Sequence, residues 1–274
     1  MEERPVQCLP EPVGSRAFAK PAEWLIGICF FDVAGFCLAQ YGHSRRNKKA
    51  LTVCDPGTAY DMLVSIFNDV IGPVMRGPSS SHCAAALRIG RLARDLMGGD
   101  FDEVLVEFDR NGSLPTTHDS QGSDMGLFGG LMGWGAADER LPGSPQALRD
   151  LGVRIRIETV DAGDPHPNTY RLTLRRGEEQ HFVRAISTGG GMMEVLGVDA
   201  FNVSMFGDCF ETLLWVGGEG HKLARELATL VSADAILVHE AGGEQLVEVK
   251  AGEFVSEQAV ARLNGAFEIG RAHV

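Results

Sequence analysis

SSSHCAAALRIGRLARDLM, residues 79–97, is the stretch that decides the fold class of this chain. From Ala84 to Met97, alanine, leucine and isoleucine recur at helical spacing with arginines between them, which predicts a helix. The serines before it suit an N-cap, because a hydroxyl can accept a hydrogen bond from a free backbone N–H of the first turn. Gly98-Gly99 then breaks the helix, and Val104 to Phe108 reads as a strand. This alternation predicts an α+β protein.

The same patterns predict further elements up to residue 198. Helical spacing favours Met125 to Met132 and Pro145 to Leu151. Strands are expected at four places: Val153 to Val160, Thr169 to Leu174, Gln180 to Ser187 and Met193 to Val198.

The C-terminal part predicts a second, smaller unit with the order βαββαβ. This order is typical of the split-βαβ arrangement, in which helices cover one face of an antiparallel sheet. The unit resembles an ACT domain, a small amino-acid-sensing module, although the topology serves many unrelated functions and implies no ligand by itself. The expected elements are a strand at Thr212 to Val216, a helix at His221 to Ser232, strands at Ala235 to His239 and Gln245 to Lys250, a helix at Ser256 to Leu263 and a strand at Phe267 to Ala272.

The length and net charge of the chain indicate which kinds of molecule it can bind. The chain has 274 residues, 44% of them hydrophobic, which is enough to bury one good core or two modest ones. Its formal net charge of −12 leaves no reserve of basic side chains to neutralise phosphates, so we expect no nucleic-acid partner. A small metabolite or another protein is favoured.

The six cysteines indicate reduced cytosolic thiols. They include no C-x-x-C pair and no paired metal-ligand spacing, and four of them fall within the first 54 residues. For Cys83 and Cys209 we favour a packed, small apolar role over a ligand role. Neither supports an iron–sulfur cluster alone, since several thiolates normally hold one.

Residues 1–58 differ in composition from the rest of the chain. An apolar run from Trp24 to Tyr41 contains Asp32, and a basic cluster follows it, which argues against a membrane span and a secretory signal. An accessory helix is one alternative. We favour another, that this extension is translated upstream sequence and that the natural start is Met62.

A turn-rich segment, Ile71 to His82, concentrates the candidate chemistry. It brings Gly, Pro, three hydroxyls and an imidazole to the start of the predicted helix. A helix N-terminus with free N–H groups and serine hydroxyls can bind a carboxylate, and His82 can act as acid or base near neutral pH. Alternatively, the serines only cap the helix and His82 packs beneath it.

The segment closely resembles I-G-P-V-M-x-G-P-S-S-S-H, which opens the β subunit of iron–sulfur L-serine dehydratases. The resemblance extends over roughly residues 62–216 and weakens in the tail. It also rests on five later runs: Arg88 to Arg94, Gly112-Ser113, Asp138 to Leu141, Pro165 to Thr169 and Gly189 to Glu194.

The resemblance implies a division into a serine dehydratase β-type, allosteric-substrate-binding-like domain at residues 59–208 and an ACT-like domain at residues 209–274. It implies a cytoplasmic enzyme that deaminates L-serine, or a related β-hydroxy amino acid, to pyruvate and ammonia by α,β-elimination of water. It also implies a [4Fe–4S] cluster, held by a cysteine-bearing α subunit and not by this chain. The expected assembly is a hetero-oligomer, or a homodimer through the β domain, with no membrane contact.

The resemblance also suggests roles for individual residues. His82 is the candidate catalytic base or orienting group, and the adjacent serines would contact the substrate carboxylate or amino group. His166, between two prolines, is either a presented polar contact or part of a rigid turn, and we favour the first. The predicted substrate-binding residues are Ser79, Ser80, Ser81, Asp124, His166 and Asn168.

One departure from the family bears on the substrate. Where family members carry G-H-G-T-D, this chain reads Ser120-Gln121-Gly122-Ser123-Asp124, and the glutamine that stands in place of the histidine cannot exchange a proton near pH 7. If the family uses that histidine for acid–base work or for contacting the cluster, this chain is inactive in that step, acts on another substrate or recruits His118 from the same loop. Cys83 also replaces the threonine that follows the family's S-S-S-H.

Two functions from other classes remain open. The chain could be a non-catalytic regulatory or scaffold subunit that senses an amino acid through its ACT-like end. It could also serve a specialised biosynthetic dehydratase with another substrate.

Overall fold

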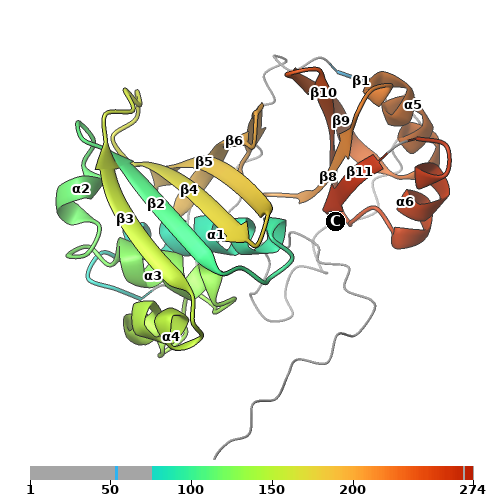
Figure 1. Cartoon of the computed structure of the whole chain (residues 1–274). Helices are drawn as coiled ribbons and strands as arrows, with labels where there is room; N and C mark the ends of the chain where they lie inside the picture. Colours follow the sequence, from blue (N-terminus) through green and yellow to red (C-terminus); the bar gives the residue numbers. More distant parts are fainter. Residues whose placement is uncertain (1–52, 55–75, 268, 274) are drawn as a thin grey trace, which may run out of the picture.

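A computed structural model describes residues 53–54, 76–267 and 269–273. Two β-sheets stand beside each other, each with helices packed on it (Figure 1). The expected mixed α+β class is therefore confirmed. The expectations about residues 1–52, including the apolar run, and about Met62 as the start lie outside the described residues.

The larger sheet has six strands in the order β3-β2-β4-β5-β6-β7. β2 and β3 are parallel, and the other neighbours are antiparallel. Its strands are β2 (Glu103–Asp109), β3 (Arg154–Val160), β4 (Thr169–Arg176), β5 (Glu179–Gly189), β6 (Met192–Val198) and β7 (Phe201–Met205).

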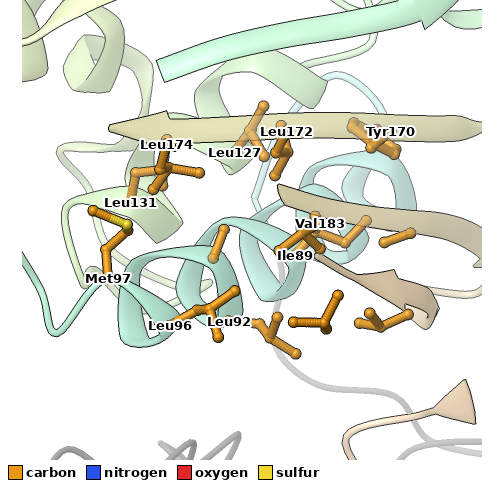
Figure 2. Close-up of a cluster of buried hydrophobic side chains, with 14 of the residues drawn as sticks. Ile89, Leu92, Leu96, Met97, Leu127, Leu131, Tyr170, Leu172, Leu174 and Val183 are labelled. Atoms are coloured by element: carbon orange, nitrogen blue, oxygen red, sulfur yellow. The ribbon is translucent and has the colours of Figure 1, made fainter. Parts of the chain in front are cut away.

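Helices cover one face of this sheet (Figure 1). Ile89 of the first of them lies beside Val183 of β5, and Leu92 and Leu96 belong with Leu172 of β4 to the same cluster of buried side chains (Figure 2). Such burial of an apolar helix face is what holds an amphipathic helix on a sheet. The helices are α1 (Ser80–Leu96), α2 (Leu114–Thr117), α3 (Ser123–Leu131) and α4 (Ser144–Asp150), with a 3-10 turn, η3 (Leu141–Gly143), before the last.

Glycines bring α1 and α3 into direct backbone contact. A Cβ added at Gly126 would lie 2.1 Å from the carbonyl oxygen of Cys83, and one added at Gly130 would lie 2.1 Å from that of Leu87. From the other side, a Cβ at Gly90 of α1 would lie 2.2 Å from a carbonyl oxygen of α3. Hydrogen is thus the only side chain that allows the two helices to cross at this separation.

The second sheet has the order β1-β9-β10-β8-β11. Its main part runs β8-α5-β9-β10-α6-β11 along the chain, so the expected βαββαβ order is confirmed. β1 lies within the range assigned to the N-terminal extension and pairs in parallel with β9 at the edge of the sheet. The elements are β1 (Val53–Cys54), β8 (Phe210–Val216), α5 (Gly220–Leu230), β9 (Ala233–Ala241), β10 (Glu244–Ala251), α6 (Glu257–Asn264) and β11 (Ile269–His273).

The second sheet uses its two faces differently. Leu214 and Val247 join the apolar cluster with α5 and α6, whereas Leu213, Trp215 and Leu246 join the core of the six-stranded sheet. Apolar side chains on both faces of β8 therefore tie the two sheets together, as the alternation of strand side chains allows.

Charged groups are buried on the face of the second sheet that meets the first. Lys250 Nζ lies 2.8 Å from both Glu211 and Glu248, and it donates a hydrogen bond of 3.0 Å to the Ser204 carbonyl of β7. His239 Nε2 lies 2.6 Å from the second oxygen of Glu248. One ammonium thus bridges two carboxylates and both sheets.

Four elements were missed from the sequence: β1, α2, η3 and β7. β7 shows the alternation that marks a strand, with Phe201, Val203 and Met205 buried and the residues between them exposed. The boundary expected at residue 208 falls in the loop between β7 and β8, and the division into named domains stays a prediction. Among the residues that the structure describes, no helix is long and apolar enough to cross a membrane.

Candidate active site

The serine-histidine turn lies at the start of α1 and is open to solvent. Ser80 is exposed, while Ser79, Ser81 and His82 are half-buried, so the turn is not enclosed in the core. The helix begins four residues before the expected Ala84, because the serines join its first turn.

Ser79 occupies the N-cap position but does not cap the helix with its side chain, which corrects the expectation from the sequence. Its hydroxyl lies 2.7 Å from His82 Nδ1 instead. The imidazole is held at one nitrogen, and Nε2 is left as the nitrogen that can exchange a proton with a bound molecule.

A loop from α2 to α3 lies directly against this turn. The backbone N–H of Ser79 donates a hydrogen bond of 3.1 Å to the carbonyl of Gln121. The Gln121 side-chain oxygen is buried and has no hydrogen-bond partner among the described residues. Gln121, where the resemblance led us to expect a histidine, therefore lies beside the serine-histidine turn.

His118 and Asp124 form a pair in the same loop. His118 Nδ1 lies 2.7 and 2.9 Å from the two carboxylate oxygens of Asp124, and its ring packs 5.1 Å from that of Phe108. Burial raises the pKa of Asp124, and the hydrogen bond from His118 opposes that rise only in part. The arrangement orients an imidazole by a carboxylate, as many acid–base catalysts require.

The Gly-Ser pair and the Pro-His-Pro-Asn loop, far apart in the sequence, meet in the structure. The Ser113 N–H donates to the Pro167 carbonyl at 2.8 Å, and the Ser113 hydroxyl bonds the side-chain oxygen of Asn168. A Cβ at Gly112 would lie 2.7 Å from the same carbonyl, which explains the glycine. The side-chain oxygen of Asn168 is thus already hydrogen-bonded within the protein.

His166 is half-buried in the Pro-His-Pro-Asn loop. Its Nδ1 accepts a hydrogen bond of 3.2 Å from the backbone N–H of Asn168, and its carbonyl accepts one of 2.7 Å from the Thr169 hydroxyl. These bonds rigidify the turn without using Nε2. The contacts of His166 and Asn168 with a substrate stay predictions.

A cavity of about 380 Å³ opens beside the loop and α3. Pro78 and Gly122 line it next to the serine-histidine turn, and Asp124 lines it from the first turn of α3. Arg149 of α4 lines it as well, a residue that no sequence pattern had marked.

The described thiols are protonated and separate. Cys83 is buried, and that burial raises its pKa to about 11. Burial also raises the pKa of Cys209, which lies in the loop between β7 and β8. Within residues 53–54, 76–267 and 269–273, no group of three or more His, Cys, Asp or Glu side chains could hold a metal ion.

The chain is similar in sequence to subunits of amino-acid dehydratases. No family model matches the sequence. The chain is homologous over about half its length to L-serine dehydratase beta chains, as its motifs had indicated.

Two curated relatives carry this homology. The chain is 38% identical over 144 residues to the "Probable L-serine dehydratase, beta chain" of Bacillus subtilis (strain 168). It is 32% identical over 149 residues to the "L-serine dehydratase, beta chain" of Peptoniphilus asaccharolyticus. Each match covers 53% of this chain, and the chain spans 64% and 65% of the length of these relatives.

Proposed function

We propose that this chain is the β subunit of a two-chain, cytoplasmic iron–sulfur L-serine dehydratase. It helps convert L-serine, or a related β-hydroxy amino acid, to pyruvate and ammonia. The observation that carries the proposal is the contact of 2.7 Å between Ser79 Oγ and His82 Nδ1, at a solvent-accessible turn beside a cavity. The names of the homologues support the subunit role.

The elimination needs help at two points, because the α-proton is weakly acidic and hydroxide is a poor leaving group. His82 Nε2 takes the α-proton, the C–H electrons form the Cα=Cβ bond, and the Cβ–O bond breaks with its electrons going to the departing hydroxide, which the proton held by His82 converts to water. The aminoacrylate then tautomerises and hydrolyses to pyruvate and ammonia. Ser79 keeps the ring oriented, while Ser80, Ser81 and the N–H groups of the first turn of α1 offer further contacts to the substrate carboxylate or amino group.

We assign the [4Fe–4S] group and the activation of the leaving hydroxyl to an α partner, as the resemblance implies. The term "beta chain" in the names of the relatives is the support for such a partner. This chain contributes the residues that bind the substrate and exchange its α-proton.

Replacing His82 by alanine tests the proposal. Anaerobic co-expression with a cysteine-bearing α partner, followed by a pyruvate assay with L-serine, should show a loss of turnover of roughly 10²- to 10⁴-fold, the usual contribution of general acid–base catalysis. The complex should stay assembled in size-exclusion chromatography. His221→Ala, at an exposed position on α5, is the matched control and should leave turnover unchanged.

Unchanged turnover in His82→Ala would contradict a catalytic role for the turn. That result would favour the second candidate function, an amino-acid-sensing regulatory subunit. The support for this alternative is the strand order β9-β10-β8-β11 with α5 and α6 packed on one face, which an ACT-like domain would have.

His118 is the proposed replacement for the histidine that Gln121 displaces. It is the imidazole that the loop pairs with a carboxylate, that of Asp124. His118→Ala should lower kcat by roughly 10²-fold, and His118→Ala with Gln121→His should regain part of it, since a histidine would return to the family position. Steady-state pyruvate kinetics measure both variants. A kcat equal to wild type in His118→Ala would show that this pair takes no part in proton transfer.

A specialised biosynthetic dehydratase is the third candidate. Gln121 favours it, because an amide in place of an imidazole changes which substrate groups can bind beside Ser79. Turnover of other β-hydroxy amino acids in the same assay, with no turnover of L-serine, would support this candidate.

A further inference from the structure

The cavity beside α3 and α4 combines an apolar wall with charges of both signs. Met125, Phe128 and Ile157 supply the apolar surface, and Arg149, Asp119 and Asp124 supply the charges. Its volume of about 380 Å³ falls at the small end of the range for metabolite sites, roughly 300–1,000 Å³. It is therefore suited to a small ligand with both a polar and an apolar part.

The positive side of this cavity lacks a counterion. Within the part of the chain that the structure describes, the Arg149 guanidinium forms no ion pair or hydrogen bond. The other cavity-lining charges do not satisfy it, since neither aspartate lies within ion-pair distance of it. A guanidinium in a concave site binds a carboxylate with two parallel hydrogen bonds, a geometry that a single carboxylate of a ligand supplies.

The two carboxylates that line this cavity can also accept hydrogen bonds from a ligand. Asp119 is exposed and, among the described residues, has no side-chain partner. Asp124 bonds His118 through Nδ1, which leaves each carboxylate oxygen with further acceptor capacity. These two carboxylates can accept hydrogen bonds from one ammonium group.

We propose that this cavity binds an α-amino acid as its zwitterion, with Arg149 on the carboxylate and Asp119 and Asp124 on the ammonium. The inference rests on the proposed function and deepens it, because it assigns a carboxylate anchor outside the motifs shared with the relatives. An amino acid bound there contacts Asp124 and so lies next to the His118 imidazole. The apolar wall receives a short side chain and disfavours a charged one.

Ligand truncation provides the first test. Isothermal titration calorimetry on the full chain without a partner should detect L-serine binding. Ethanolamine, which lacks the carboxylate, and 3-hydroxypropionate, which lacks the ammonium, should each bind at least about 10-fold more weakly, because each leaves one side of the cavity unpaired. Absence of L-serine binding, or equal binding of ethanolamine, would overturn the proposal.

Replacement of Arg149, the residue proposed to bind the carboxylate, provides the second test. Arg149→Gln should weaken L-serine binding about 10- to 100-fold, whereas Arg149→Lys should keep part of the affinity, because it retains the charge but not the fork of donors. Arg225→Gln on α5 makes the same change outside the cavity and should bind as wild type does. Thermal unfolding of each variant shows whether it is folded. Wild-type affinity in folded Arg149→Gln would refute the role of Arg149.

Different results would contradict the dehydratase function and the amino-acid site in the cavity. In the assembled two-chain complex, Arg149→Gln should raise KM for L-serine by a similar factor with a much smaller change in kcat. If amino-acid binding follows the pattern above but the complex forms no pyruvate, the cavity assignment stands and the dehydratase function fails. If the complex forms pyruvate with an unchanged KM in Arg149→Gln, the dehydratase function stands and the cavity assignment fails.

Discussion

Lys250→Met should lower the free energy of unfolding by about 3–5 kcal/mol, the usual cost of removing one partner from a buried ion pair. Glu211 and Glu248 are fully buried, and the Lys250 ammonium lies 2.8 Å from each. Methionine keeps most of the length of the side chain but leaves two carboxyl groups without a cation. It also removes the hydrogen bond to the Ser204 carbonyl, which links the second sheet to the first.

The pKa values of the two carboxyl groups are shifted in opposite directions. Burial, and then the charge of Glu248, raises the pKa of Glu211 well above its usual value. Burial also raises the pKa of Glu248, but the hydrogen bond from His239 and the charge of Lys250 outweigh it and leave that pKa below its usual value. The cluster therefore favours the protonated form of Glu211 and the ionised form of Glu248.

Chemical denaturation followed by circular dichroism measures the loss in Lys250→Met. Lys222→Met, which removes an exposed ion pair with Glu219, is the control and should change stability by less than about 1 kcal/mol. A loss in Lys250→Met no larger than that of the control would contradict the bridging role.

Glu211→Gln is the complementary variant, because glutamine resembles the protonated carboxyl. A group whose folded pKa is raised stabilises the fold fully below its unfolded pKa, and that stabilisation is lost as pH rises. The free energy of unfolding of the wild type therefore falls, through Glu211, as pH rises above about 4.3, the ordinary pKa of glutamate. Glu211→Gln should gain stability relative to wild type as pH increases, and a difference that does not vary with pH would show that Glu211 ionises normally.

Gly130→Ala combined with Gly126→Ala should destabilise the protein by about 3 kcal/mol or more, at or beyond the upper end of the usual cost of overpacking. Each added methyl carbon would lie 2.1 Å from a backbone carbonyl oxygen of α1, and a backbone atom cannot move aside as a flexible side chain can. Separation of the helices would also shift Asp124 relative to His82, so turnover in the assembled complex should fall as well.

Gly265→Ala is the matched control for these helix variants. It makes the same chemical change at the end of α6, where φ is −72° and a Cβ meets no atom within 4 Å. It should stay within about 0.5 kcal/mol of wild type. Thermal unfolding compares the three proteins, and equal midpoints for the double variant and the control would show that α1 and α3 can separate without cost.

Most elements were predictable because their signals are local. The apolar spacing between Ala84 and Met97 predicted α1, and the βαββαβ order of the tail is confirmed by β8 to β11. Errors occurred where local signals are weak. α2 spans four residues, too few for a helical period, and β7 was overlooked although its apolar residues alternate.

The candidate site was only partly predictable. The run of serines and His82 was visible as a motif, but its hydrogen bond from Ser79 to His82, in place of a helix cap, depends on side-chain geometry. His118 was a candidate from its position in the loop, and its contact with Asp124 emerged only in the structure. Arg149 carried no signal, since an arginine in the last turn of a helix usually complements the helix dipole.

The sequence by itself determined the α+β class, the succession of helices and strands, and the motifs shared with L-serine dehydratase beta chains, because period, turn residues and motif identity are properties of neighbouring residues. Only the tertiary structure decided which charges meet across β8 and β10, how closely α1 and α3 approach, and that Arg149 and Asp124 line one cavity. Those facts depend on the crossing of elements distant in the chain, where close packing and desolvation act on pairs that no local pattern specifies.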